Sequence, residues 1–225
     1  MRSSVALFAL VALLGFAAAG ASAMPAHKFH HRPVHHNGDA DTAAYPLIEI
    51  TLYMESLCPD CQALIAGDLW NVWNSSISSI MNLTLVPYGN AKESQSGSTW
   101  EFTCQHGMYE CVGNVLETCA INLLQNSTVW FPFIHCLEGT SAPNAAGPAC
   151  AAKLGINFDP IDACMTSAQG NAMEHEMALK TAALVPAHTY VPWVTLNGAH
   201  CVPCENGHLK QAICGAYTGP KPADC

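Results

Sequence analysis

A pair of cysteines between a predicted strand and a predicted helix constrains the fold of this 225-residue chain more than any other feature. Residues 47–54 are rich in β-branched and aromatic side chains, which predicts a strand. Cys58-Pro59-Asp60-Cys61 follows, and residues 62–73 then place apolar side chains on one face of a helix. Residues 81–86 are predicted to form a second strand. A right-handed crossover would make the two strands parallel.

The middle of the chain has a different character. Residues 102–164 hold six cysteines among many glycines and prolines. Helical spacing of apolar residues occurs at 115–125 and again at 172–184. We therefore expect a mostly helical, disulfide-stapled insertion at about residues 92–185.

The C-terminal part returns to strand patterns. Residues 190–196 are predicted to form a strand, and Asn197-Gly198 is a strong signal for a hairpin with a short return strand. Residues 209–216 are predicted to form a terminal helix. A βαβ unit, a helical insertion and a ββα unit together indicate an α/β fold.

The position of Cys58 predicts redox chemistry. Unpaired N–H groups and the helix dipole at a helix N-terminus favour a thiolate, whereas the carboxylate of Asp60 opposes it. Cys61, one turn later, should be more buried. We expect Cys58 to attack a substrate disulfide and Cys61 to resolve the mixed disulfide, which requires an external thiol reductant but no cofactor or metal. Pro192 matches the cis-proline loop of thioredoxin-like folds, and Val191 would offer backbone groups to the substrate.

The N-terminus predicts entry into the secretory pathway. Residues 1–23 combine Arg2, an apolar stretch and the small residues Ala21-Ser22-Ala23, as in a cleaved signal peptide. The apolar stretch is shorter than the ~20 residues that span a bilayer. Residues 24–45 hold five histidines and are interpreted as a flexible leader or pro-segment, with metal capture as the alternative. The folded domain is expected to span 46–225.

Cysteine content, sequons and charge agree with that route. Twelve cysteines suit an oxidising compartment. Asn74, Asn82 and Asn126 begin N-glycosylation sequons. The formal charge is −9 with no basic run, which argues against a nucleic-acid partner. We expect no membrane span in the mature chain.

One segment resembles a known family. Residues 104–119 match the signature CQHGxxECxxNxxxxxC in nearly every fixed place, although four residues separate Asn114 from Cys119. In this segment and in its C-terminal part, the chain resembles the gamma-interferon-inducible lysosomal thiol reductase family over roughly residues 47–225. The resemblance implies a thioredoxin-like fold with a helical insertion and Cys58 and Cys61 as the active pair. It also implies a glycosylated reductase of disulfide-containing proteins in endosomes or lysosomes, active at acid pH; secretion from the cell remains the other location.

The remaining cysteines are expected to be structural, and their pairing stays open. These disulfide candidates are Cys104, Cys111, Cys119, Cys136, Cys150, Cys164, Cys201, Cys204, Cys214 and Cys225. Cys201-Val202-Pro203-Cys204 departs from the family pattern. It is either a relay pair for the first CxxC or, as we expect, a local disulfide, because no strand-to-helix junction is predicted before it.

Other polar residues are expected to be structural. His106, His135 and His175 are interpreted as hydrogen-bonded or surface histidines, with proton transfer as the alternative for each. Gln105, Gly107 and Asn114 should set local turns and caps, and Trp193 should serve packing.

Three other functions remain open at this stage. The first is a disulfide oxidase or isomerase of the secretory pathway on the same fold, whereas the expected reductase would take its electrons from a small thiol or a protein donor. The second is a disulfide-rich secreted binding protein without activity. The third is a metal protein that uses the cysteine pairs and the His-rich segment.

Overall fold

The structure, a computed structural model, describes residues 45–225. The predicted signal peptide (1–23) and nearly all of the His-rich segment (24–45) lie outside this range, so both remain predictions. No helix within the described range is long and apolar enough to cross a membrane.

A mixed four-stranded sheet carries the fold, with strand order β2-β1-β5-β6. Strands β1 (Ile48–Met54) and β2 (Met81–Pro87) are parallel, as the predicted crossover requires. Strand β5 (Trp193–Leu196) runs antiparallel to β1, and β6 (Ala199–His200) pairs with β5 at the edge. Alternate side chains of β1 are buried in the main core, which is why this stretch reads so clearly as a strand.

The crossover between β1 and β2 is helical from Pro59 to Trp73. It consists of α1 (Pro59–Leu64), a π-helical turn (Ile65–Leu69) and α2 (Trp70–Trp73). The helix begins directly after Cys58, as predicted, and Pro59 occupies its first turn, where the missing N–H costs nothing.

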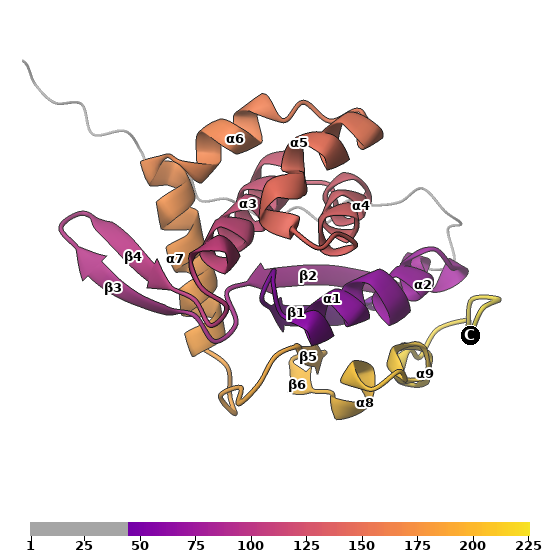
Figure 1. Cartoon of the computed structure of the whole chain (residues 1–225). Coiled ribbons are helices and arrows are strands. Elements are labelled where there is room, and N and C mark those ends of the chain that lie inside the picture. Colours follow the sequence, from indigo (N-terminus) through magenta and orange to yellow (C-terminus); the bar gives the residue numbers. More distant parts are fainter. Residues whose placement is uncertain (1–44) are drawn as a thin grey trace, which may run out of the picture. The chain divides into compact units, whose positions relative to one another are not determined.

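The insertion contains a hairpin followed by five helices. Its elements are β3 (Lys92–Ser96), β4 (Thr99–Thr103), α3 (Met108–Leu124), α4 (Ser127–Glu138), α5 (Pro143–Leu154), α6 (Asp159–Met165) and α7 (Ala168–Ala182). In Figure 1, α3 to α6 lie above β2, whereas β5, β6 and the C-terminal helices lie below it. The helical character is as predicted.

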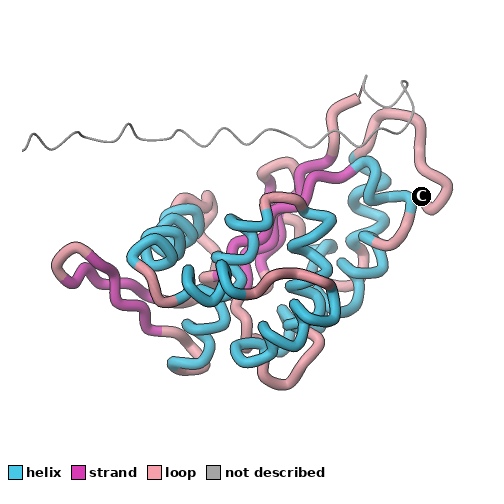
Figure 2. Tube along the Cα trace, turned by 90° about the horizontal axis from the view of Figure 1, so that it is seen from above, coloured by secondary structure: helices cyan, strands magenta, loops and turns pink. Residues whose placement is uncertain are grey.

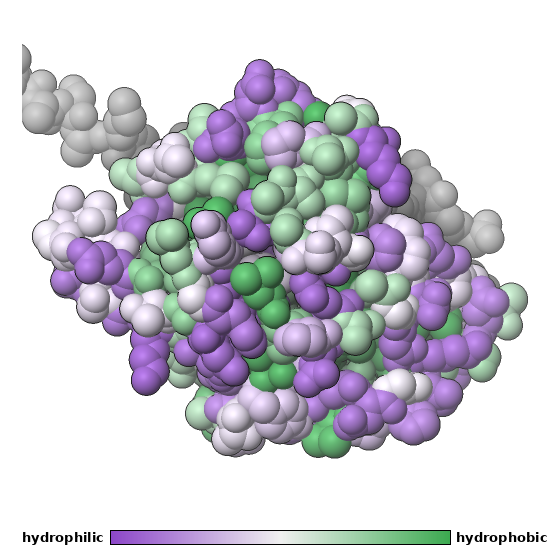
Figure 3. All heavy atoms as spheres, viewed as in Figure 1, coloured by the Kyte–Doolittle hydropathy of each residue, from purple (hydrophilic) through white to green (hydrophobic). Residues whose placement is uncertain are grey.

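The hairpin β3–β4 was not predicted. It projects from the rest of the described chain (Figures 1 and 2), and its surface is covered by hydrophilic or neutral side chains (Figure 3). Both strands are largely exposed, so they lack the alternation of apolar and polar residues that marks a half-buried strand.

Two expectations about the C-terminal part were wrong. The strand predicted at 190–196 begins only at Trp193, since Pro192 has no N–H to donate to a ladder. A strand-to-helix junction does occur at Cys201, between β6 and the single-turn helix α8 (Val202–Glu205). The terminal helix α9 (Leu209–Ala216) has the predicted bounds.

Gly170 allows α7 to approach the end of α6. A Cβ at this position would lie 2.1 Å from the carbonyl oxygen of Cys164 and 3.2 Å from the sulfur of Cys119. Cys119 and Cys164 form the disulfide that joins α3 to α6. Any side chain here would therefore displace backbone, because a carbonyl cannot rotate away as a flexible side chain can.

We expect Gly170→Ala to lower the free energy of unfolding by about 1–3 kcal/mol, as overpacking does elsewhere. Gly67→Ala is the matched control, since a Cβ there meets nothing within 4 Å and helix propensity favours alanine by up to about 1 kcal/mol. Urea unfolding would compare the two variants. Equal effects would contradict this account of Gly170.

Besides Glu110 in the first turn of α3, three further buried carboxyl groups lie within the helical insertion. Glu117 in α3, Glu138 in α4 and Glu174 in α7 are at most 3% exposed. Burial raises the pKa of Glu117 to about 7 and that of Glu174 to about 8, and it raises the pKa of Glu138 well above its usual range. Glu174 accepts a hydrogen bond from Thr118 Oγ1 (2.7 Å), which opposes the shift without cancelling it. Burial at these three positions therefore favours the neutral form of the carboxyl group.

This burial predicts a pH-dependent stability. A carboxyl group with a raised pKa in the folded state stabilises fully below its unfolded pKa, and that contribution is lost as pH rises through the folded pKa. For Glu174 the loss is on the order of 4 kcal/mol between pH ~4.5 and ~7.5. Glu174→Gln should therefore raise the melting temperature relative to wild type progressively more as pH rises over this interval.

Glu176→Gln is the control, because Glu176 lies exposed on the same helix. Melting curves at several pH values would make the comparison. A pH-independent difference between wild type and Glu174→Gln would refute the role given to this carboxyl group.

Candidate active site

Cys58 and Cys61 lie where β1 leads into α1. Cys58 is the N-cap residue of α1, and Cys61 follows one turn later. They are the two cysteines outside a disulfide in residues 45–225. Cys58 is 6% exposed and Cys61 is fully buried, so the sulfur nearer the helix tip is also the nearer to solvent.

The environment separates the acidities of the two thiols. A hydrogen bond from the Cys61 side chain lowers the pKa of Cys58 most; burial opposes this, the backbone N–H groups of Cys61 and Asp60 assist it, and the Asp60 charge opposes it. The net result is a pKa of about 6 for Cys58. Burial, together with the hydrogen bond to Cys58, raises the pKa of Cys61 well above its usual range. The expected direction holds, and the hydrogen bond from the partner thiol is the largest single cause.

The proline loop lies opposite Cys58. The Val191–Pro192 peptide bond is cis, and the Cys58 thiol donates to the Val191 carbonyl oxygen at 3.8 Å across 133 residues of sequence. The structure thus brings together the four residues that the sequence suggested for this site. Val185–Pro186 is also cis, which the sequence did not indicate.

Helix α3 holds the loop that leads into Cys58. The Ser56 N–H donates to Asn114 Oδ1 at 2.9 Å, and Ser56 Oγ donates to the Glu110 carbonyl at 3.1 Å. A Cβ on Gly113 would lie 2.2 Å from Ser56 Oγ. Asn114 was expected to set a local turn, which was wrong: it is buried and bonds a residue 58 positions away.

Gln105 and Gly107 lie just before α3. The Gln105 side chain accepts a hydrogen bond from Asn90 Nδ2 at 2.7 Å, which joins two loops. Gly107 caps α3 with a φ of 86°, where a residue with a side chain would be strained.

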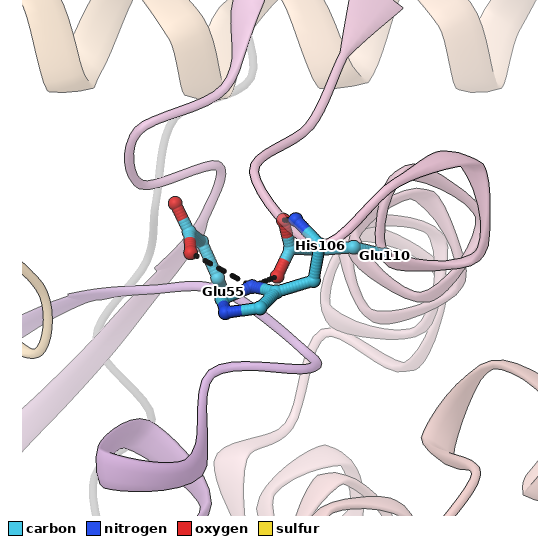
Figure 4. A group of neighbouring side chains, drawn as sticks. All are labelled: Glu55, His106 and Glu110. Carbon is cyan, nitrogen blue, oxygen red and sulfur yellow. Dashed lines mark hydrogen bonds and ion pairs between the residues drawn. The ribbon is translucent and has the colours of Figure 1, made fainter.

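A cluster of Glu55, His106 and Glu110 adjoins the same loop (Figure 4). Glu55 follows β1, His106 precedes α3, and Glu110 is in the first turn of α3. The imidazole Nδ1 hydrogen-bonds Glu110 and lies 3.6 Å from Glu55 Oε2. Burial raises the pKa of Glu55 to about 7. Burial lowers the pKa of His106, but the bond to Glu110 and the two carboxylate charges outweigh it and raise the pKa overall.

Comparison with known proteins shows the family of this chain. A model of the gamma interferon inducible lysosomal thiol reductase family matches residues 49–154. The gamma-interferon-inducible lysosomal thiol reductase of Carassius auratus is 40% identical over 187 residues, which cover 79% of this chain and 72% of the relative. The protein of the same name from Mus musculus is 37% identical over 181 residues, covering 80% and 71%.

The chain belongs to the gamma-interferon-inducible lysosomal thiol reductase family. It is therefore a thiol–disulfide oxidoreductase. Solved structures support the fold. DsbA of Chlamydia trachomatis superposes with a TM-score of 0.53 at 15% identity over 85% of this chain and 95% of its own. BdbD of Bacillus subtilis gives 0.55 at 9% identity over 78% and 88%. The thioredoxin-like α/β fold with a disulfide-rich insertion is thereby confirmed.

In this member of the thiol reductase family, the ten other cysteines form five disulfides. The pairs are Cys104–Cys111, Cys119–Cys164, Cys136–Cys150, Cys201–Cys204 and Cys214–Cys225. The first closes the loop that carries His106 onto α3. The fourth, Cys201–Cys204, lies at the N-terminus of α8. It is the local disulfide that was expected for the second CxxC.

The remaining singled-out side chains serve packing. His135 stacks on Trp70, and His175 stacks on Trp100 while bonding Glu93. Trp193 is buried and stacks on His200.

The three sequon asparagines lie outside the core. Asn74 and Asn82 are exposed, and Asn126 is half-buried at the N-cap of α4. Glycosylation of the three remains a prediction.

Sequence reasoning missed Glu55 and Glu110. The signal for Glu55 was a carboxylate at the end of a buried strand, with only two residues between it and the CxxC. Glu110 lay within the recognised signature, but its distance from Glu55 along the chain concealed their meeting.

The hydrogen bond between the two thiols leads to an alkylation experiment. In the reduced protein, Cys58 should react with iodoacetamide with a midpoint near pH 6. Cys61→Ala removes the donor and should shift that midpoint upward by about one pH unit or more. Cys61→Ser, which keeps a donor, should shift it less. An unchanged midpoint in Cys61→Ala would show that the helix end alone lowers the pKa.

Proposed function

We propose that this chain reduces disulfide bonds of protein substrates, with Cys58 as nucleophile and Cys61 as resolving thiol. The observation that carries the proposal is the pairing of an acidic, slightly exposed thiol with a buried, weakly acidic one, opposite the Val191–Pro192 loop. Thiolates attack disulfides and thiols do not. The pKa values therefore give each sulfur its role.

The proposed steps balance as follows. The Cys58 thiolate attacks one substrate sulfur, a mixed disulfide forms, and the other substrate sulfur leaves as a thiolate. Cys61 then attacks the Cys58 sulfur, so that the Cys58–Cys61 disulfide forms and the bond between Cys58 and the substrate breaks. The proton of the Cys61 thiol passes to the substrate sulfur that leaves in this second step. The substrate gains two electrons and the enzyme loses them, so an external thiol, small or protein-bound, must reduce the pair again.

The pKa of Cys58 favours reduction over oxidation of substrates. A value of about 6 lies closer to the ~7 of thioredoxin, a reductant, than to the ~3.5 of DsbA, an oxidant. It also permits work in an acidic vesicle. At pH ~5 roughly one Cys58 in ten would be thiolate, against about one in 3,000 for a free cysteine. We place its activity in endosomes and lysosomes, which the names of the relatives and the neutral buried carboxyl groups of the insertion support.

Substrate chains are proposed to lie along the Val191–Pro192 loop. The Val191 carbonyl faces the Cys58 sulfur, so the backbone beside it is placed to meet an extended segment whose cystine is under attack.

The test is turnover of insulin with a thiol reductant at pH ~4.5 and ~7. Wild type should accelerate reduction at both values, and Cys58→Ser should fall to the rate of the reductant alone. Cys61→Ser should accumulate a mixed disulfide visible by mass spectrometry, because the resolving sulfur is missing.

A Cys201→Ser/Cys204→Ser double variant serves as the control and should retain turnover. Equal trapping by Cys58→Ser and Cys61→Ser would overturn the assignment of roles. A reduction potential near the ~−120 mV of DsbA, rather than the ~−270 mV of thioredoxin, would reverse the proposed direction.

A further inference from the structure

We propose that Glu55, His106 and Glu110 form a binding site for a divalent first-row metal ion such as Zn²⁺, beside the redox pair but independent of its sulfurs. One oxygen of each carboxylate and Nδ1 of the imidazole lie within 4.8 Å of one another. Figure 4 shows the imidazole between the two carboxylates. The three ligands come from the end of β1, the loop before α3 and the first turn of α3.

The second oxygen of each carboxylate is held by a backbone N–H. Glu55 Oε1 accepts from Asn90 N at 2.5 Å, and Glu110 Oε1 accepts from His106 N at 2.9 Å. Each group therefore presents its Oε2 toward His106 Nδ1. Hydrogen bonds that orient ligating carboxylates in this way are typical of metal sites.

Glu55 provides independent evidence for a ligand. It is fully buried, and its Oε2 accepts no hydrogen bond. Glu110 is also fully buried. Each ion pair within residues 45–225 uses a histidine, so neither Lys nor Arg compensates these carboxylates. When both groups are ionised, they bring two negative charges, which a divalent ion matches.

The ligand set suits Zn²⁺ better than a harder ion. Calcium takes six to eight oxygen ligands, and magnesium keeps most of its waters. Zinc binds imidazole and carboxylate at about 2.0–2.2 Å and accepts three protein ligands plus a water. Tetrahedral ligands at that bond length lie about 3.4 Å apart, close to the 3.6 Å between Glu55 Oε2 and His106 Nδ1. The Glu110 oxygen, now hydrogen-bonded to the imidazole, would move aside to admit the ion.

An entry path exists and the sulfurs are not required. The His106 side chain is 34% exposed, so the site opens to solvent on that side. The Cys58 N–H donates to the Glu55 carbonyl at 3.2 Å, which makes the redox pair a neighbour of the site. None of the three proposed ligands is a cysteine.

The test uses the full mature chain with Cys58 and Cys61 oxidised to a disulfide, so that neither sulfur can bind metal. Equilibrium dialysis against Zn²⁺ alone should give one more bound ion per chain in wild type than in His106→Gln. The affinity of that ion should fall at least about tenfold in the variant, since even changes around a ligand cost that much. Any ions held by the His-rich segment would be common to both proteins.

His175→Gln is the matched control, because His175 bonds a single glutamate and stacks on a tryptophan. It should bind as wild type does. Glu55→Gln is a second test variant of nearly unchanged size, in case His106→Gln does not fold, and circular dichroism would check both. X-ray absorption of the zinc-loaded oxidised wild type should show nitrogen and oxygen neighbours without sulfur. Equal zinc binding by wild type and both variants, or a sulfur neighbour, would overturn the proposal.

Discussion

The close approach of α3 to the Ser56 loop is the constraint on which the rest of the site depends. Gly113 leaves room for Ser56, and Asn114 and the Glu110 carbonyl bond its N–H and hydroxyl. The N-terminus of α1 follows within three residues, so this contact fixes where the Cys58 sulfur stands. The insertion is therefore part of the active site and not merely an addition to the thioredoxin-like sheet. It also carries His106 and Glu110 to the end of β1.

Burial, rather than pairing with lysine or arginine, favours the neutral form of three buried carboxyl groups of the insertion. Eight Lys and Arg face seventeen Asp and Glu in the whole chain. Within residues 45–225, the buried carboxyl groups of Glu117, Glu138 and Glu174 face a threonine hydroxyl or one another. Their pKa values rise because burial penalises the charged form. This environment favours the folded state at acid pH, which supports the proposed site of activity.

Much of the fold followed from the sequence, and the failures have physical causes. β1, β2 and α9 each bury one face, so the spacing of their apolar residues indicated a strand or a helix. The β3–β4 hairpin buries little and left no such signal. Helices α4 and α5 each contain an internal proline, at Pro132 and Pro148, which weakened the helical pattern.

The site was predictable only in part, for similar reasons. Cys58, Cys61 and Pro192 could be chosen because their roles depend on local motifs. The meeting of Glu55 with His106 and Glu110 depends on tertiary packing, which no spacing along the chain encodes. The choice of partner for each of ten cysteines is likewise a property of the folded backbone.

The exposure of the five disulfides determines which of them a thiolate of another molecule could reduce. Cys119, Cys150, Cys164 and Cys204 are buried, so three of the bridges have at least one sulfur that a second molecule's nucleophile cannot reach. Neither cysteine of Cys104–Cys111 is buried, and the same holds for Cys214–Cys225, whose Cys225 is exposed. In a compartment rich in reductant, these two disulfides are the most open to attack. One holds the His106 loop and the other ties the C-terminal residue to α9, so reduction of either would free a segment while the buried bridges persist.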